Sequence, residues 1–189
     1  MRRLLIALLL TVLAATSAHA GLFEQRQAQC QECHGANGVS TTPAIPSLGG
    51  QPETYVLYQL VAFREEQRKV PAMNAIMKDM SDDDLRAAAA WIATLPPPPP
   101  SKEPGDTARM ARGQALADKN RCGFCHNPDY SGHDQIPRLA HQREDYLQAA
   151  LHDYKVETRI GGGAMMSEVL YPLKDDDLAD LAYYMAHVR

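Results

Sequence analysis

Residues 30–34 read Cys-Gln-Glu-Cys-His, and residues 122–126 read Cys-Gly-Phe-Cys-His. These two copies of C-x-x-C-H use every cysteine of the 189-residue chain, and the pattern is the attachment signature of a c-type haem. The two thiols reach the vinyl groups on one porphyrin edge, and the next residue carries its imidazole under the iron. A redox dithiol or a zinc site would leave both histidines unexplained. We therefore predict two covalent haem c groups, attached through Cys30, Cys33, Cys122 and Cys125.

The two halves of the chain resemble each other well beyond these pentapeptides. Residues 45–51 read IPSLGGQ, and residues 136–142 read IPRLAHQ. The offset between matched positions stays between 91 and 93 residues, which indicates an internal duplication. Further matched features follow in the same order: Tyr55 and Tyr146, Arg68 and Arg159, Met73 and Met166, and the acidic runs 81–85 and 174–178.

The hydrophobic pattern is helical in both halves. Residues 55–63 and 146–154 are each expected to form a middle helix, and no stretch alternates long enough to be a strand. Ser81 is the expected N-cap of one final helix, because the aspartates after it suit the positive end of a helix dipole. Apolar residues recur at i, i+3, i+4 and i+7 in both final helices: Leu85, Ala88, Ala89 and Ile92, and Leu178, Leu181, Ala182 and Met185. The chain is predicted to be all-α.

The halves are separated by five consecutive prolines at residues 96–100. Such a run cannot continue a helix and favours an extended spacer of limited flexibility. We predict an N-terminal domain at 21–95, a Pro-rich linker at 96–105 and a C-terminal domain at 106–189.

The N-terminus has the features of a secretory signal. Arg2 and Arg3 precede an apolar run of about a dozen residues, and Ala18-His19-Ala20 supplies a cleavage pattern. The run is short of the roughly 20 residues that span a bilayer, although an uncleaved anchor is the alternative. We predict that residues 1–20 are a cleaved signal peptide of a periplasmic protein that does not span the membrane. The net charge of −4 predicts no nucleic-acid partner, because such partners need clustered Lys and Arg.

Each haem iron bound by one histidine needs a second strong ligand or an open position. His34 and His126 are the predicted proximal ligands. The predicted distal ligands are Met73 and Met166, which occupy matched positions 39 and 40 residues after their histidines. Met77 and Met165 are their respective rivals.

Other matched residues are candidates for supporting the haems. A backbone carbonyl near Pro46 or Pro137 would accept the axial imidazole N–H and fix its orientation, although both prolines also suit ordinary turns. Arg68 and Arg159 are candidates to pair with haem propionates, or they are simply solvated. The remaining histidines of the mature chain have no counterpart in the first half and are expected to be surface or packing residues: His133, His141, His152 and His187.

The order of these motifs, repeated twice, resembles the dihaem class I cytochromes c of the cytochrome c4 family. The resemblance covers essentially the whole mature chain. It implies two tandem small class I cytochrome c domains, related by a pseudo-twofold axis, each wrapped round one covalent haem with His–Met ligation. Two departures lie near the second haem: Ala140-His141 replaces Gly49-Gly50, and Asn127 replaces the glycine that follows the first histidine.

The expected function is electron transfer without a substrate, because iron with two protein ligands has no vacant site for other chemistry. The resemblance implies a periplasmic shuttle between a quinol-oxidising complex and a terminal oxidase or reductase. One alternative is the dihaem subunit of a flavocytochrome c sulfide dehydrogenase, with a flavoprotein as its partner. Another is a dihaem enzyme, a peroxidase or a thiosulfate-oxidising protein, which would need an open iron.

Overall fold

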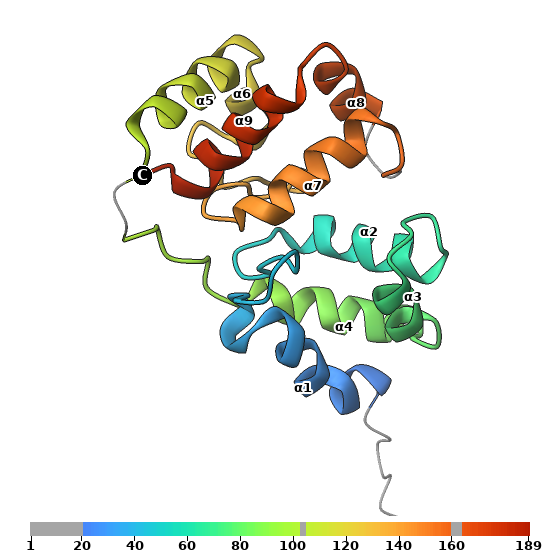
Figure 1. Cartoon of the computed structure of the whole chain (residues 1–189). Helices are drawn as coiled ribbons and strands as arrows, with labels where there is room; N and C mark the ends of the chain where they lie inside the picture. Colours follow the sequence, from blue (N-terminus) through green and yellow to red (C-terminus); the bar gives the residue numbers. More distant parts are fainter. Residues whose placement is uncertain (1–20, 103–104, 160–163) are drawn as a thin grey trace, which may run out of the picture.

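The computed structural model describes residues 21–102, 105–159 and 164–189 (Figure 1). The predicted signal peptide at residues 1–20 lies outside the described residues, as do residues 103 and 104 of the predicted linker. Within the described ranges, the only extended pairing is one isolated bridge between His133 and Ile136, which confirms the all-α prediction. The elements are α1 (Leu22–His34), a 3-10 turn (Ala36–Gly38), α2 (Glu53–Arg64), α3 (Pro71–Met77), α4 (Asp82–Ala93), α5 (Thr107–Lys119), α6 (Cys122–His126), α7 (Glu144–Lys155), α8 (Ala164–Leu170) and α9 (Asp175–His187).

The helices form two domains, each with its own apolar core. In the N-terminal domain α4 packs against α1 and α2, and in the C-terminal domain α9 packs against α5 and α7. All eight apolar positions predicted for the final helices lie in these cores. Leu85 and Leu178, matched across the duplication, are the largest fully buried side chains. The repeated pattern thus builds the same core twice.

The start of α4 is fixed by the predicted cap. The Ser81 hydroxyl accepts a hydrogen bond from the Asp84 N–H, and the Asp84 carboxylate accepts one from the Ser81 N–H, forming a capping box. Asp84 also accepts from the Phe23 N–H at 2.9 Å and so joins the start of α1 to α4. In α9 the Lys174 N–H donates to Asp177 at 2.8 Å. A lysine side chain cannot accept a hydrogen bond, so this helix start has only one of the two capping-box bonds, the one to the carboxylate.

The proline run is extended and contacts both domains. The Gly50 N–H donates to the carbonyl of Leu95, directly before the prolines. Pro98 is buried, and its carbonyl lies 3.2 Å from Nδ1 of His141 in the C-terminal domain. In Figure 1 this segment runs along one side of the molecule, while α2 and α7 face the opposite domain. The linker therefore packs as part of the interface as well as connecting the domains.

The crossing of α5 and α9 depends on Gly113. A Cβ atom at this position would lie 2.3 Å from the Asp180 carbonyl oxygen and 2.5 Å from Cβ of Tyr184. Replacing Gly113 with Ala is therefore expected to lower the free energy of unfolding of the C-terminal domain by about 1–3 kcal/mol, because overpacking outweighs the gain of about 1 kcal/mol in helix propensity. Denaturant titration measures this loss. Gln114→Ala at the exposed neighbouring position is the control, and a stabilised Gly113→Ala protein would contradict the crossing.

Candidate haem-binding sites

The two C-x-x-C-H motifs each end a helix with a buried histidine. In the N-terminal domain the motif is the last turn of α1, whereas in the C-terminal domain it forms α6, a separate helix after a break at Arg121, whose φ is +56°. His34 and His126 are buried. All four cysteines have unpaired thiols, with Cys33 and Cys125 exposed. Burial raises the pKa of the Cys30 and Cys122 thiols.

Both histidines are oriented by a carbonyl, as the sequence suggests. Nδ1 of His34 lies 2.8 Å from the Pro46 carbonyl oxygen, and Nδ1 of His126 lies 2.8 Å from that of Pro137. Burial lowers the pKa of both imidazoles, although the hydrogen bond to the carbonyl opposes this shift. A neutral ring that donates from Nδ1 leaves the Nε2 lone pair free for a metal. Because a carbonyl oxygen only accepts, a neutral His34 or His126 in this contact would be the tautomer that an axial haem ligand requires.

The residue after each histidine turns the chain through a positive φ. Gly35 has φ +82°, and a Cβ there would lie 1.9 Å from the Val39 carbonyl oxygen. Asn127 has φ +68°, and its side-chain amide donates to Ser131 Oγ and to the Gly132 carbonyl. Asparagine tolerates such backbone better than most residues. The second half therefore keeps the turn of the first without its glycine.

In the N-terminal domain the two candidate methionines lie in different surroundings. Met73 is the third residue of α3 and is half-buried at the edge of the core. Met77 is 2% exposed and packs inside that core, where it fills space as methionine commonly does. A ligand must face the haem, so the position of Met73 favours it over Met77.

The C-terminal domain repeats this arrangement. Met166 is the third residue of α8, packs against the core and is half-buried. Met165 is 66% exposed. The shared position on a short helix supports the register that pairs Met166 with Met73.

The two matched arginines meet between the domains instead of being solvated. Arg68 donates to the Gln59 amide oxygen at 2.7 Å and to the Tyr146 hydroxyl at 3.2 Å. Arg159 donates to the hydroxyls of Tyr55 at 3.1 Å and Tyr146 at 3.3 Å. We call these five residues the interdomain arginine cluster.

This cluster has a surplus of positive charge. Arg159 is 6% exposed, and within the described residues its Nε has no hydrogen-bond partner. The groups that accept from the two guanidiniums are the Gln59 amide and two tyrosine hydroxyls, with no carboxylate among them. Burial opposes ionisation of the Tyr146 hydroxyl, but the guanidiniums of Arg159 and Arg68 outweigh it and lower its pKa to about 7. A buried charge calls for an opposite charge, so the cluster suits the carboxylates of a haem.

The other histidines lie where the sequence suggests, on the surface or in packing contacts. His133 and His152 have about half of their side chains exposed, and His187 stacks on Tyr183. His141 adopts φ +62° at the position of Gly50, whose φ is +70°, and its Nε2 lies 2.8 Å from the Val188 carbonyl. This second departure thus also keeps the backbone turn of the first half.

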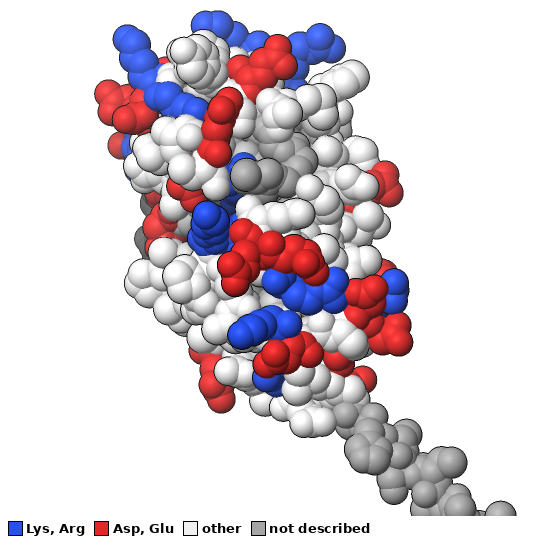
Figure 2. Space-filling view, turned by 90° about the vertical axis from the view of Figure 1, so that its right-hand side faces the viewer, with Lys and Arg blue, Asp and Glu red and all other residues white. Residues whose placement is uncertain are grey.

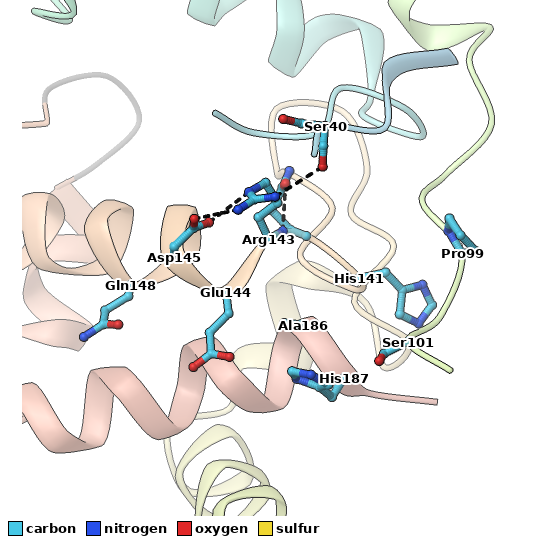
Figure 3. Close-up of a pocket in the computed structure, with 11 residues that line it drawn as sticks. Ser40, Pro99, Ser101, His141, Arg143, Glu144, Asp145, Gln148, Ala186 and His187 are labelled. Carbon is cyan, nitrogen blue, oxygen red and sulfur yellow. Dashed lines mark hydrogen bonds and ion pairs between the residues drawn. The ribbon is translucent and has the colours of Figure 1, made fainter. Parts of the chain in front are cut away.

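A groove beside the linker contains none of the predicted haem ligands (Figure 3). It lies between Ser40 of the N-terminal domain, the start of α7 and the end of α9. There Arg143 donates to the Ser40 carbonyl and pairs with Asp145. Among the described residues no cluster of three or more His, Cys, Asp or Glu side chains is suited to a metal ion.

The sequence predicts a set of haem ligands but gives the interface residues no role. Tyr55 and Tyr146 were matched features without a role, and Gln59 has no counterpart in the second half, where Ala150 stands at that offset. For Tyr55 and Tyr146 the only available signal was their matched place at the starts of the two middle helices.

Charges of both signs are mixed on one face of the molecule. On the face shown in Figure 2, Lys and Arg side chains lie next to Asp and Glu, so neither sign forms a single field there. None of the described helices is both long and apolar enough to cross a bilayer.

Two protein-family models match the chain, one in each half. The model for cytochrome c matches residues 110–189. The model for cytochrome c oxidase, cbb3-type, subunit III matches residues 14–92.

Known proteins match over most of the chain. Cytochrome c4 from Pseudomonas aeruginosa is 31% identical, with 98% of each chain covered. A thiosulfate dehydrogenase electron acceptor from Stutzerimonas stutzeri is 31% identical, over 84% of this chain and 78% of the relative. The crystal structure of reduced cytochrome c4 from Pseudomonas stutzeri superposes with a TM-score of 0.77 at 28% identity, covering 90% of this chain and all of that one. With its two cytochrome c domains, the chain belongs to the cytochrome c4 family of dihaem electron-transfer cytochromes and carries two covalently bound haem c groups.

Proposed function

We propose that the chain is a periplasmic electron carrier, exported by cleavage after Ala20, with domain boundaries at 21–95 and 106–189. In the N-terminal domain Cys30 and Cys33 hold the haem, and His34 and Met73 bind its iron. Cys122, Cys125, His126 and Met166 do the same in the C-terminal domain. The observation that carries the proposal is the matched pair of donor sets, each with a carbonyl-oriented imidazole and a half-buried methionine on a short helix.

The haem iron, when bound, supplies a one-electron redox couple. The residues of this chain bind and orient that group. The Pro46 and Pro137 carbonyls hold each imidazole ring in one tautomer and orientation. A soft thioether from Met73 or Met166 would favour ferrous iron and raise the potential. With a histidine and a methionine holding each iron, the proposed site would pass electrons and activate no small molecule, which disfavours a peroxidase.

The proposed partners are redox proteins. The first candidate is a shuttle between a quinol-oxidising complex and a terminal oxidase or reductase, which is what membership of the cytochrome c4 family implies. Relatives named thiosulfate dehydrogenase electron acceptor favour a second candidate, in which the chain takes electrons from such a dehydrogenase. Mixing the oxidised protein with each purified donor and following haem reduction by stopped flow would separate the two.

Mass spectrometry tests the attachment sites. We expect the mature chain to begin at Gly21 and to weigh two haems more than its amino acids, with no thiol open to alkylation. Replacing Cys33 with Ala removes one of the two thioether bonds of the first haem and leaves the second haem unaffected. A disulfide between any two of the four cysteines would contradict the assignment.

A further inference from the structure

Two glutamines join the domains by a reciprocal pair of contacts. Oε1 of Gln142 accepts from the Ser47 N–H at 2.8 Å, and its Nε2 donates to the Ser47 carbonyl at 2.8 Å. Oε1 of Gln51 accepts from the Arg138 N–H at 3.1 Å, and its Nε2 donates to the Arg138 carbonyl at 3.0 Å. Both glutamines are buried. The two contacts are equivalent in the duplication, because Gln142 lies 91 residues after Gln51 and Arg138 lies 91 residues after Ser47.

Each glutamine binds the peptide unit that orients the histidine of the other domain. The peptide between Pro46 and Ser47 accepts from His34 through its carbonyl and donates to Gln142 through its N–H. The peptide between Pro137 and Arg138 accepts from His126 and donates to Gln51. His34 is thus connected to Gln142, and His126 to Gln51, by two hydrogen bonds that share one planar amide.

Hydrogen bonds that share a peptide unit strengthen each other. An acceptor on the N–H increases the negative charge on the carbonyl oxygen of the same resonant amide. A more negative carbonyl withdraws the Nδ1 proton further and makes the imidazole a stronger electron donor through Nε2. A stronger donor favours ferric iron, so the glutamine contact lowers the potential of the haem in the opposite domain.

We propose that Gln142 is a positioning residue that tunes the N-terminal haem, and that Gln51 tunes the C-terminal haem, each across the domain interface. The inference rests on the proposed function only in taking His34 and His126 as iron ligands. It makes the potential of each haem depend on the domains being docked. Glutamine suits this position because one planar group supplies both the donor and the acceptor that a single backbone residue needs.

Two single variants of the haem-loaded protein test the proposal. Leu is similar in size to Gln and cannot hydrogen-bond. Gln142→Leu is expected to raise the ratio of reduced to oxidised N-terminal haem at fixed ambient potential roughly twofold, the size expected if one bond strengthens the next by ~10–30%. Gln51→Leu is expected to do the same to the C-terminal haem. Redox titration followed by NMR of the haem methyl groups assigns each change to its haem.

A second measurement distinguishes an effect of each glutamine on the haem potential from a general loosening of the domain interface. In the reduced protein the Nδ1–H resonance of His34 should move upfield in Gln142→Leu while that of His126 stays, and Gln51→Leu should give the reverse. Asp145→Ala is the control, since it removes the interdomain bond from the Ala44 N–H and leaves both tuned peptides intact. It should move neither resonance.

The proposal is overturned if each glutamine variant changes the haem of its own domain, or if both haems change alike, as loosened docking would cause. Failure of the ligand assignment would look different. The unmutated protein would then lack the His34 and His126 NMR shifts of iron-bound imidazole.

Discussion

Replacing Met73 with Ala is expected to open one coordination position on the N-terminal haem iron and to lower the potential of that haem. Alanine has no donor atom, and the loss of a soft thioether removes a ligand that favours ferrous iron. The reduced variant should bind one equivalent of carbon monoxide, whereas the unmutated protein should bind none. Absorption titration with the gas gives the stoichiometry directly.

Met77→Ala is the matched control four residues away. Met77 is 2% exposed in the core, so its truncation is expected to cost about 2–5 kcal/mol of unfolding free energy through the cavity it leaves. The iron of the N-terminal haem should keep both ligands and bind no carbon monoxide. Carbon monoxide binding by Met77→Ala and not by Met73→Ala would reverse the assignment.

The C-terminal domain provides the same test, with an exposed methionine as the control instead of a buried one. Met166→Ala is expected to open the second iron. Met165 is 66% exposed, so Met165→Ala should change the free energy of unfolding by less than about 0.5 kcal/mol. The reduction potential of the C-terminal haem should stay unchanged. Loss of that potential in Met165→Ala alone would show that the register across the duplication is shifted by one residue.

The sequence predicts what is encoded locally and repeated. The spacing of Leu85, Ala88 and Ile92 fixes a helix face, and the same spacing 93 residues later confirms it. The capping box at Ser81 follows from neighbours three residues apart. Even the carbonyls that hold the histidines were foreseeable, because Pro46 and Pro137 share one position in both halves.

The interface was beyond prediction because its partners are far apart in the chain. The contact of Arg159 with Tyr55 joins residues 104 positions apart, and no local pattern fixes how two domains dock. The effect of the two departures near the second haem could not be predicted for the same reason. Asn127 and His141 keep positive φ values through side-chain bonds that only the folded loops supply.

Replacing Arg159 with Met is expected to lower the free energy of unfolding of the haem-loaded protein by about 3–5 kcal/mol, the range for removing one partner of a buried ion pair. If haem carboxylates face the interdomain arginine cluster, the variant leaves buried negative charge without its cation. It should also lower the potential of the facing haem, because a nearby positive charge favours the reduced, less positive iron. Chemical denaturation and redox titration measure the two effects separately.

The sign of the stability change decides between the two interpretations of the cluster. With no anion buried beside it, Arg159 would be a desolvated charge held by phenol and amide groups alone, and an apolar side chain of similar length would be neutral or stabilising. Arg112→Met is the control, because it removes an arginine that lies outside the cluster. Arg112 is 57% exposed where it pairs with Asp180, so its removal should change the free energy of unfolding little. A stable Arg159→Met protein with unchanged potentials would therefore exclude propionate binding at this cluster, whereas a large loss at Arg159 alone would support it.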